Sequence, residues 1–536
     1  MDKFKNFSID NLSKAVNDNC LEYQKKHIVN IIKSLAKHRR ALDASDTGTG
    51  KTFASIFVCI ELGLIPFVIC PKSVISSWRK VLKILKLNKY YIINYESLQN
   101  LKYFIGECNE LIKCPYLKII KKEPINISIK REPDIASGMT NKLKKYKTLY
   151  EWVNVPDNLL LIFDEAHKCK NRISNNSEIL YSAAKTKAYI LMLSATIAEK
   201  PKTFVTAGYV LGLFNEIKKG CEWINNCGEI NTPNPMLAVH NVIFNEYASR
   251  MKISETGNNF KKNIVEAICL KMTESEEIQK MYDLIQLAHE SLKRKENASE
   301  ALARLTYARM RIEILKVPRS IELTKDLYDK GYSIAIFTNY TDTINKLSIE
   351  LNTNCIVYGD QSIDERSKNV ELFNCDKERI ILCNIKSGGF GISLHDLNGK
   401  HPRVTLIFPS YSAQDTLQSL GRIHRAGGKT DCLQYILYCK DTIEESMCEG
   451  IKDKIMNISS INNGNKYGYN IKNLIEDDNN LTEDIPHATP ESLFNSLYTQ
   501  IGVLHSKKDR INNELKIIDN EIIELQKKLE EFITYV

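Results

Sequence analysis

Short apolar runs alternate along this chain with stretches of helical periodicity, and turn residues separate the two. Runs this apolar are typical of parallel strands covered by helices on both faces, because such strands show no polar side to water. The alternation therefore predicts an α/β fold with two doubly wound parallel-sheet lobes, residues 1–215 and 321–455. Strands are expected at Phe67–Cys70, Leu159–Phe163 and Tyr189–Leu193 in the first lobe, and at Ser333–Phe337, Cys355–Tyr358, Arg379–Cys383, Val404–Phe408 and Gln434–Tyr438 in the second.

Two regions depart from this alternation. Residues 216–320 are expected to be a mostly helical connector, because Thr273–Lys316 is rich in Glu, Lys, Ala and Leu and carries no strand pattern. A basic insertion at about 100–155 interrupts the first lobe, and it is either a solvated surface or a contact for phosphates. Its charged residues include Lys118, Lys121, Lys122, Lys130, Arg131, Lys142, Lys144, Lys145 and Lys147.

The C-terminal tail has a pattern of its own. An Asn-, Asp- and Gly-rich linker, 456–489, precedes a helix expected at 490–536. Apolar residues recur there at alternating spacings of three and four, with Lys508 as the one polar interruption, which predicts a coiled-coil seam. The seam consists of Ile501, Leu504, Lys508, Ile511, Leu515, Ile518, Ile522, Leu525, Leu529 and Phe532. It could pair with another chain or fold back onto this one.

A glycine-rich block, Ser45 to Thr52, opens a predicted helix at Phe53–Leu62. Glycines let backbone N–H groups close around phosphate oxygens at the positive end of a helix, so we expect Thr47, Gly48, Thr49 and Gly50 to hold a nucleotide. Lys51 would reach the β- and γ-phosphates and Thr52 would offer a hydroxyl to Mg²⁺, which makes ATP and Mg²⁺ the expected cofactors. The alternative is an ordinary glycine-rich turn.

Asp164 and Glu165 follow directly on the apolar run Leu159–Phe163. Two adjacent carboxylates at a strand end beside a phosphate loop are expected to have different roles: Asp164 holds Mg²⁺, and Glu165 polarises the attacking water as general base. An acidic first turn of a helix would look similar.

In the second lobe, Arg422 and Arg425 lie three residues apart on a predicted helix and would project from one face. Two guanidiniums aimed across a cleft at a γ-phosphate act as arginine fingers, and Gln418, near the same face, could position the water or the phosphate. A basic surface helix is the alternative. The glycines of Ser387–Gly391 permit a close backbone approach upstream of this block.

Taken in order, these blocks resemble a superfamily 2 helicase-type ATPase over about residues 20–450. The blocks are Tyr23-Gln24, Ser45–Thr52, Asp164-Glu165-Ala166-His167, Ser194-Ala195-Thr196, Ser387–Gly391 and Gln418 with Gly421–Arg425. The resemblance implies two RecA-like lobes, adenine recognition by Gln24, and coupling of hydrolysis to lobe movement by His167, Ser194, Thr196, Gly389 and Gly391.

Within that superfamily the chain is similar to Swi/Snf-type duplex DNA translocases and to related helicases of large DNA viruses. The likeness rests on Val68–Pro71 with Trp78, Asn94-Tyr95-Glu96, Lys170-Asn171 after the Asp-Glu-Ala-His block, and Thr442–Glu445. Two blocks depart from that group: Ser194-Ala195-Thr196 stands where Gly-Thr-Pro is usual, and Ala426-Gly427-Gly428 where Ile-Gly-Gln is usual.

Composition and net charge exclude few of the remaining functions. The net charge of +9 fits a nucleic-acid partner without requiring one, with DNA favoured and RNA an alternative. The start of the chain lacks a signal peptide's apolar core and no run is long enough to span a bilayer, so no membrane partner is expected.

Fifteen scattered cysteines with no Cys-x-x-Cys pair indicate a reducing intracellular compartment, either cytoplasm or nucleus, or a virion or viral factory if the protein is viral. The predicted function is an ATP-dependent DNA translocase or helicase serving transcription, replication or repair. The alternatives are an RNA-directed helicase and an interaction subunit with a vestigial ATPase. A vestigial ATPase would not need to keep the residues of the ATP site, yet the sequence has them all: Lys51, Asp164, Glu165, Arg422 and Arg425.

Overall fold

The computed structural model describes residues 4–124, 146–231, 235–244, 246–270, 275–294, 298–359, 361–385, 392–410, 412–439, 444 and 458. The chain divides into two compact units, Met1–Glu476 and Asp477–Val536. The predicted coiled coil at 490–536, and the linker before it apart from Ile458, lie outside the described residues. Within the described part of the chain, no helix is both long and apolar enough to cross a membrane.

The first sheet has eight strands in the order β10-β1-β9-β8-β2-β3-β4-β5. From β10 to β3 all neighbours are parallel, and β4 and β5 extend the sheet antiparallel. The predicted strands β2, β8 and β9 are confirmed. The bounds are β10 (Ala248–Ser249), β1 (Arg40–Asp43), β9 (Tyr189–Leu193), β8 (Leu159–Asp164), β2 (Ile65–Cys70), β3 (Tyr91–Asn94), β4 (Lys102–Ile105) and β5 (Ile112–Lys113).

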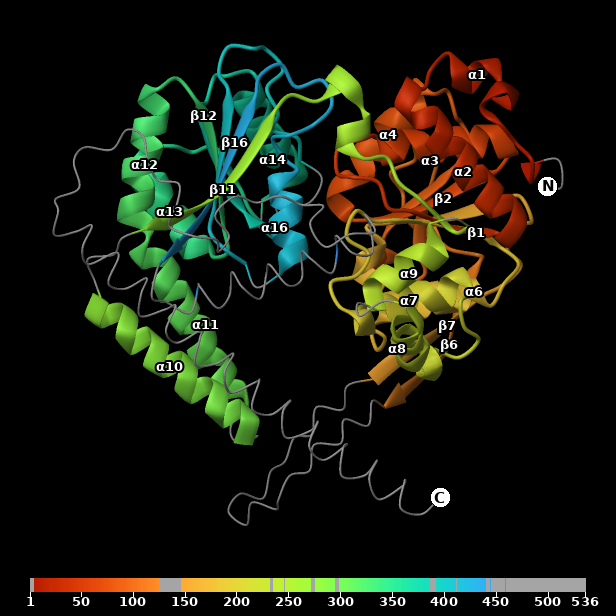
Figure 1. Ribbon diagram of the computed structural model, residues 1–536, viewed down its shortest axis with the longest axis horizontal. Coiled ribbons are helices and arrows are strands. Elements are labelled where there is room, and N and C mark those ends of the chain that lie inside the picture. The colour runs from red at the N-terminus through yellow and green to blue at the C-terminus, as the bar shows by residue number, and fades with distance from the viewer. Residues whose placement is uncertain are drawn as a thin grey trace, which may run out of the picture. The chain divides into compact units, whose positions relative to one another are not determined.

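Both faces of this sheet are covered, as the apolar runs predicted. Along β8, Leu161 and Phe163 belong to one hydrophobic cluster while Leu160 and Ile162 belong to the other. Figure 1 shows β1 and β2 with helices on either side. One layer contains α1 (Lys14–Asn17), α2 (Glu22–His38), α3 (Lys51–Leu62) and α4 (Ile75–Ile84), and the other contains α5 (Tyr95–Gln99), α6 (Asn175–Ala184) and α7 (Pro201–Leu211).

The second sheet has six parallel strands in the order β11-β16-β15-β12-β14-β13. All five strands predicted for this lobe are present. They are β12 (Ser333–Thr338), β13 (Ile356–Val357), β14 (Ile380–Asn384), β15 (Arg403–Ile407) and β16 (Cys432–Cys439). The helices α12 (Val317–Asp329) and α13 (Thr341–Leu351) cover one face, and α14 (Ile363–Asn374) and α16 (Ala413–Leu420) the other (Figure 1).

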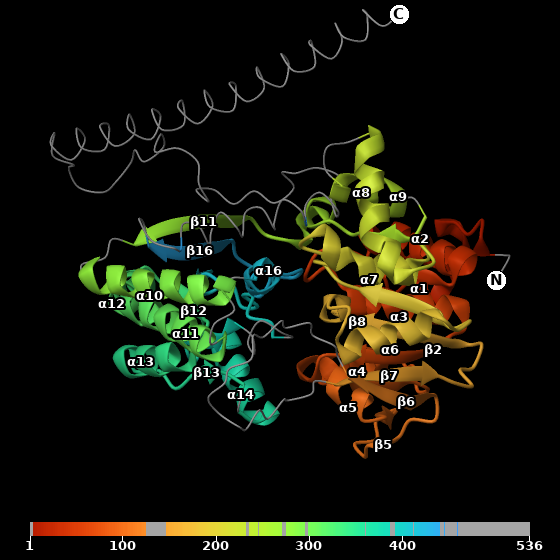
Figure 2. The ribbon, with the colours of Figure 1, turned by 90° about the horizontal axis from the view of Figure 1, so that it is seen from below.

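The stretch expected as a mostly helical connector also contributes a strand to each sheet. It contains β10 and the edge strand β11 (Asn263–Leu270), which pairs with β16 from Asn263–Cys432 to Leu270–Cys439 (Figure 2). β11 was not predicted, because Asn263 and Glu266 interrupt its apolar residues and most of its positions are only partly buried. The remainder is helical: α8 (Gly220–Asn231), α9 (Pro235–Ile243), α10 (Ser275–Arg294) and α11 (Ala298–Leu315), the last two sharing a small hydrophobic cluster of their own.

The basic insertion begins and ends as an antiparallel pair, β6 (Leu117–Pro124) with β7 (Tyr146–Trp152). Two of its lysines are charge-paired within the protein: Lys118 Nζ lies 2.7 Å from a carboxylate oxygen of Glu151, and Lys147 pairs with Glu178. The central part, 125–145, with Lys142, Lys144 and Lys145, lies outside the described residues. Lys118 and Lys147 thus have carboxylate partners within the protein, and the two interpretations of the insertion, a solvated surface and a contact for phosphates, both stay predictions.

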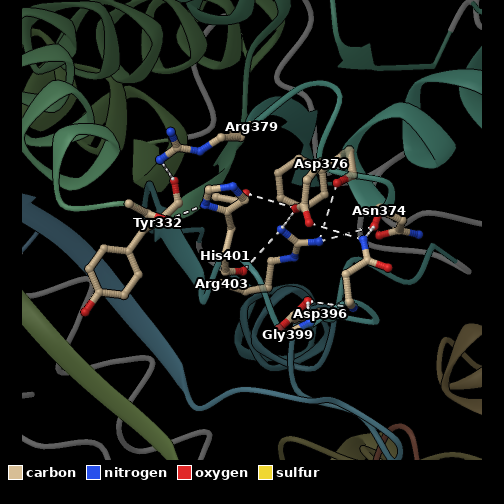
Figure 3. Close-up of polar contacts among 12 residues, drawn as sticks. Tyr332, Asn374, Asp376, Arg379, Asp396, Gly399, His401 and Arg403 are labelled. Atoms are coloured by element: carbon tan, nitrogen blue, oxygen red, sulfur yellow. Dashed lines mark hydrogen bonds and ion pairs between the residues drawn. The ribbon is translucent and has the colours of Figure 1, made fainter.

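A buried ion pair anchors the amino-terminal edge of the second sheet (Figure 3). Arg403, the first residue of β15, is fully buried and donates to Asp376 Oδ1 at 2.5 Å. Its guanidinium also stacks on Phe373, and Asn398 donates to Asp376 Oδ2 at 3.2 Å. Because the strands are parallel, this cluster lies at the opposite edge of the sheet from the strand ends that carry the candidate site.

Candidate functional site

Three neighbouring parallel strands place the first-lobe motifs side by side. β1 leads into the glycine-rich block, β8 ends at Asp164, and β9 leads into Ser194. The carboxyl ends of parallel strands meet at one edge of a sheet, so sequence blocks that are far apart converge there. Ser194 N–H donates to the Asp43 carbonyl at 3.0 Å, so the residue after β9 lies directly beside the end of β1, which leads into the glycine-rich block.

The glycine-rich block forms a tight loop before α3. Gly48 and Gly50 have φ values of 87° and 94°, the left-handed region that favours glycine. A Cβ on Gly50 would lie 2.5 Å from Gln24 Nε2, so the loop has no room for a side chain there. Lys51, the first residue of α3, donates through Nζ to the carbonyls of Ser45 (2.8 Å) and Asp46 (3.2 Å). Thr52 follows it in the first turn of the helix.

Gln24 contacts the glycine-rich loop from α2. Its Nε2 donates to the Thr49 carbonyl at 3.2 Å, while its Oε1 accepts from Leu21 N–H at 3.0 Å. The hydroxyl of Tyr23 donates to the same Thr49 carbonyl at 3.1 Å. This pair therefore supports the backbone of the loop, and recognition of adenine by Gln24 stays a prediction.

Asp164 is held from two sides by aromatic residues. The indole N–H of buried Trp78 donates to Asp164 Oδ2 at 2.8 Å, and the hydroxyl of Tyr95 donates to the Asp164 backbone carbonyl at 2.8 Å. Burial, with the neighbouring charge of Glu165, raises the pKa of Asp164 to about 7. The sequence marked Trp78 and Tyr95 only as family likenesses; their contacts with Asp164 depend on strands brought together by the fold.

Glu165 adopts a left-handed backbone with φ of 52°, which is uncommon for a residue other than glycine. Its Oε2 lies 3.3 Å from His167 Nδ1 and accepts from Gln418 Nε2 at 3.4 Å. Burial alone would raise the pKa of Glu165, but His167, Lys51 and Arg422 together lower it. The carboxylate is therefore ionised at neutral pH, as a general base must be.

A chain of polar contacts joins the Asp-Glu-Ala-His block and the Ser-Ala-Thr block of the first lobe to the second lobe. His167, in the short helical turn Ala166–Cys169, approaches Ser194 Oγ at 3.2 Å through Nδ1 and Gln418 Nε2 at 3.4 Å through Nε2. Ser194 Oγ in turn accepts from Thr196 N–H at 3.2 Å. The residues expected to couple hydrolysis to movement thus contact one another, except for Gly389 and Gly391, which lie outside the described residues.

The expectation that Arg422 and Arg425 lie on a helix is wrong, because α16 ends at Leu420 and both residues follow in the turn beyond it. Their guanidiniums nevertheless meet one loop: Arg422 donates to the Ile392 carbonyl at 3.4 Å and Arg425 to Ser393 Oγ at 2.6 Å. Burial lowers the pKa of Arg422 to about 10. Burial and repulsion from Arg422 lower the pKa of Arg425 to about 9. Both remain charged at neutral pH.

Second-lobe residues reach the glycine-rich loop of the first. A Cβ on Gly48 would lie 3.1 Å from Arg425 Cγ, and a Cβ on Gly421 would lie 2.8 Å from Thr47 Cγ2. With Gln418 on Glu165, these contacts bring both lobes to one site. Two desolvated guanidiniums, one of them on a residue beside the glycine-rich loop that carries Lys51, suit a ligand with several negative charges, which is the chemistry of a nucleoside triphosphate.

A site of this construction defines a class of ATPase in which two parallel-sheet lobes share one nucleotide, and the comparisons agree with that class. Residues 17–199 match the family described as type III restriction enzyme, res subunit, and residues 316–427 match the helicase conserved C-terminal domain. A putative ATP-dependent RNA helicase of Acanthamoeba polyphaga mimivirus is 35% identical over 490 residues, 87% of this chain and 88% of that protein. A chromatin remodeling factor of Schizosaccharomyces pombe is 22% identical over 472 residues, 78% of this chain but 31% of that protein.

The chain therefore belongs to the superfamily 2 helicases and ATPases, and it is related to both Swi/Snf-type and viral members. It is an ATP-dependent nucleic-acid motor, a nucleic-acid-dependent ATPase. Among solved structures, the SWI2/SNF2 ATPase core of Sulfolobus solfataricus in complex with double-stranded DNA aligns with this chain at 16% identity and a TM-score of 0.33. The alignment covers 83% of this chain and 97% of the Sulfolobus chain. That likeness is too low to add to the assignment.

Proposed function

We propose that the chain is a translocase on duplex DNA whose two RecA-like lobes close on ATP and step along the duplex with each cycle of hydrolysis, in transcription, replication or repair. The observation that carries this proposal is the approach of Arg425 to Gly48, because it gives both lobes a share in one nucleotide site. A motor needs such sharing so that the γ-phosphate, and its loss, are felt by both lobes.

The residues suit a magnesium–ATP complex. Lys51 would leave the carbonyls of Ser45 and Asp46 for the β- and γ-phosphates, while Thr52 and Asp164 would hold Mg²⁺. Bound ATP with its metal supplies the phosphoanhydride bond that is hydrolysed. The ionised carboxylate of Glu165 would take the proton of the attacking water, and Gln418 would orient that water. Arg422 and Arg425 would neutralise the charge that develops on the phosphoryl oxygens.

The polar chain through His167 is the proposed route from chemistry to movement. Its members are Glu165, His167, Ser194 and Gln418, and they bridge the lobes by side-chain contacts between 3.2 and 3.4 Å. A change at Glu165 on hydrolysis alters what His167 can donate or accept, and therefore alters the hold on Gln418. Thr196, bonded to Ser194, would pass the change to the loop after β9.

Duplex DNA is favoured because the chain carries the residues of the Swi/Snf likeness, among them Trp78 and Tyr95, which both donate hydrogen bonds to Asp164. RNA is the second candidate, because the mimivirus relative is named as a putative RNA helicase. The Ser194-Ala195-Thr196 block, which is more typical of unwinding helicases, also leaves strand separation open as the mode of action.

The test is ATP hydrolysis by the full chain with duplex DNA, single-stranded DNA or RNA of matched length. We expect Mg²⁺-dependent hydrolysis, stimulated at least several-fold and most strongly by duplex DNA. Lys51→Ala should abolish hydrolysis, and Glu165→Gln should bind ATP without turnover. Glu151→Gln, an exposed carboxylate paired with Lys118, serves as the control. Stimulation by RNA alone would refute the DNA proposal, and full activity in both site variants would refute the assigned roles.

A further inference from the structure

An acidic residue lies inside the loop that is proposed to bind phosphates. Asp46 follows Ser45 in the glycine-rich block, and its side chain is 14% exposed. A carboxylate at this point of the loop should repel a triphosphate, because both carry negative charge. The backbone carbonyl of the same residue accepts from Lys51 Nζ at 3.2 Å, so Asp46 is a direct neighbour of the lysine that is proposed to bind the phosphates. A loop that binds ATP therefore needs this charge to be compensated.

Arg250 supplies the compensation. It is paired with Asp46 and its side chain is 5% exposed; Nε donates to Asp46 Oδ1 at 3.2 Å and a terminal guanidinium nitrogen donates to the same oxygen. The other carboxylate oxygen accepts from Ile253 N–H at 2.9 Å. Both oxygens of Asp46 are thus turned away from the loop interior and toward the segment after β10.

The same segment follows the outer side of the loop through backbone contacts. Asp46 N–H donates to the Met251 carbonyl at 3.0 Å, Met251 N–H donates to Ser45 Oγ at 2.9 Å, and Ala44 N–H donates to the Ser249 carbonyl at 2.9 Å. These bonds continue the β1–β10 pairing beyond the end of the sheet. They fix Arg250 opposite Asp46 whether or not its charge is present.

We infer that Arg250 is a positioning residue of the nucleotide site, which neutralises Asp46 and so keeps Lys51 available for the phosphates. This inference rests on the proposed ATP site. Removing the guanidinium leaves a nearly buried carboxylate without its cationic partner in the loop that carries Lys51, and that negative charge opposes the binding of a triphosphate. The loss then falls on ATP affinity, because the general base and the arginines of the second lobe are untouched.

Variants that change the charges of Arg250 and Asp46 distinguish this role from a merely structural one. The experiment measures the dissociation constant of a fluorescent ATP analogue, and KM and kcat for ATP, in full-length Arg250→Ala, Arg250→Lys and the double variant Arg250→Ala with Asp46→Asn. We expect Arg250→Ala to raise the dissociation constant by a factor of about ten or more, with a smaller fall in kcat. Arg250→Lys keeps the charge and should lose less. The double variant removes the unpaired carboxylate and should bind ATP more tightly than Arg250→Ala.

Lys252→Ala is the matched control, since Lys252 lies in the same segment but is 39% exposed and pairs only loosely with Glu255, at 3.7 Å. Unchanged ATP affinity in Arg250→Ala overturns the inference, as does a double variant that binds no better than Arg250→Ala. If neither Arg250→Ala nor the double variant folds, Arg250 serves the stability of the lobe and the inference is overturned. A wild-type protein that does not bind ATP refutes the proposed function instead, so the two failures are distinguishable.

Discussion

Replacing Trp78 with Phe tests whether the support behind Asp164 matters to the ATP chemistry. The substitution keeps most of the buried apolar volume and removes one donor, the indole N–H that lies 2.8 Å from Asp164 Oδ2. A hydrogen bond to a charged group contributes about 1.5–3 kcal/mol, which corresponds to a factor of about 10–100 in an equilibrium or rate constant. Since that bond favours the ionised form of Asp164, its loss leaves the carboxylate harder to ionise and freer to turn.

We therefore expect Trp78→Phe to lower kcat/KM for ATP by about 10–100-fold and to raise the Mg²⁺ concentration needed for half-maximal activity. The assay is steady-state hydrolysis in the presence of stimulating nucleic acid, titrated with Mg²⁺. Trp152→Phe is the matched control, because Trp152 is also buried and donates its indole N–H at 2.9 Å, to the Ile179 carbonyl on α6. Equal behaviour of the two variants would refute the reasoning, since both lose a buried indole hydrogen bond and only one lies at the site.

Three further predictions concern the second lobe. Arg425→Ala should bind nucleotide nearly as well as the wild type yet hydrolyse it about 10³-fold more slowly, measured by nucleotide binding alongside turnover; a variant that cannot bind ATP contradicts the role of a finger. Arg403→Leu leaves Asp376 buried and unpaired, so chemical denaturation should show a loss of about 3–5 kcal/mol, which adding Asp376→Leu should partly restore. His395 has its pKa lowered to about 4, mainly by burial, so the unfolded chain takes up the proton first and stability should fall as the pH drops from about 6.5 to 4. His395→Gln should remove about 1–2 kcal/mol of that fall, and an unchanged pH dependence of unfolding would contradict it.

The sequence predicted the buried strands well and the partly exposed ones poorly. Strands such as β8 and β12 are buried on both faces, so all positions between their ends are apolar and the run stands out. β11 is mostly only partly buried and its apolar residues are interrupted by Glu266, and β10 is only two residues long, so neither stands out in the sequence. They are strands because a partner strand satisfies their backbone groups, and that partner lies far away in the sequence.

The candidate site was predictable where chemistry depends on residue type at short spacing. The glycines and lysine of the loop and the Asp164-Glu165 pair could be assigned because each block is contiguous. The local structure of Arg422 and Arg425 could not be predicted. Their separation of three residues suggested one face of a helix, but α16 ends at Leu420, before both of them. The pairing of Asp46 with Arg250 was also invisible, since the two residues are 204 positions apart and meet only because β10 lies beside β1.

Three residues around the candidate site each support an acidic residue of that site. Trp78 and Tyr95 donate hydrogen bonds to Asp164, one to its carboxylate and one to its backbone carbonyl. Arg250 likewise stands behind Asp46 on the outer side of the phosphate loop. Any ATPase of this class needs the reactive groups themselves, so those groups cannot tell one subgroup from another. The supporting residues set how firmly each acidic residue is held and how its charge is balanced. We therefore expect substitutions behind the site to change the degree of stimulation by nucleic acid, whereas substitutions of Lys51 or Glu165 abolish hydrolysis with or without it.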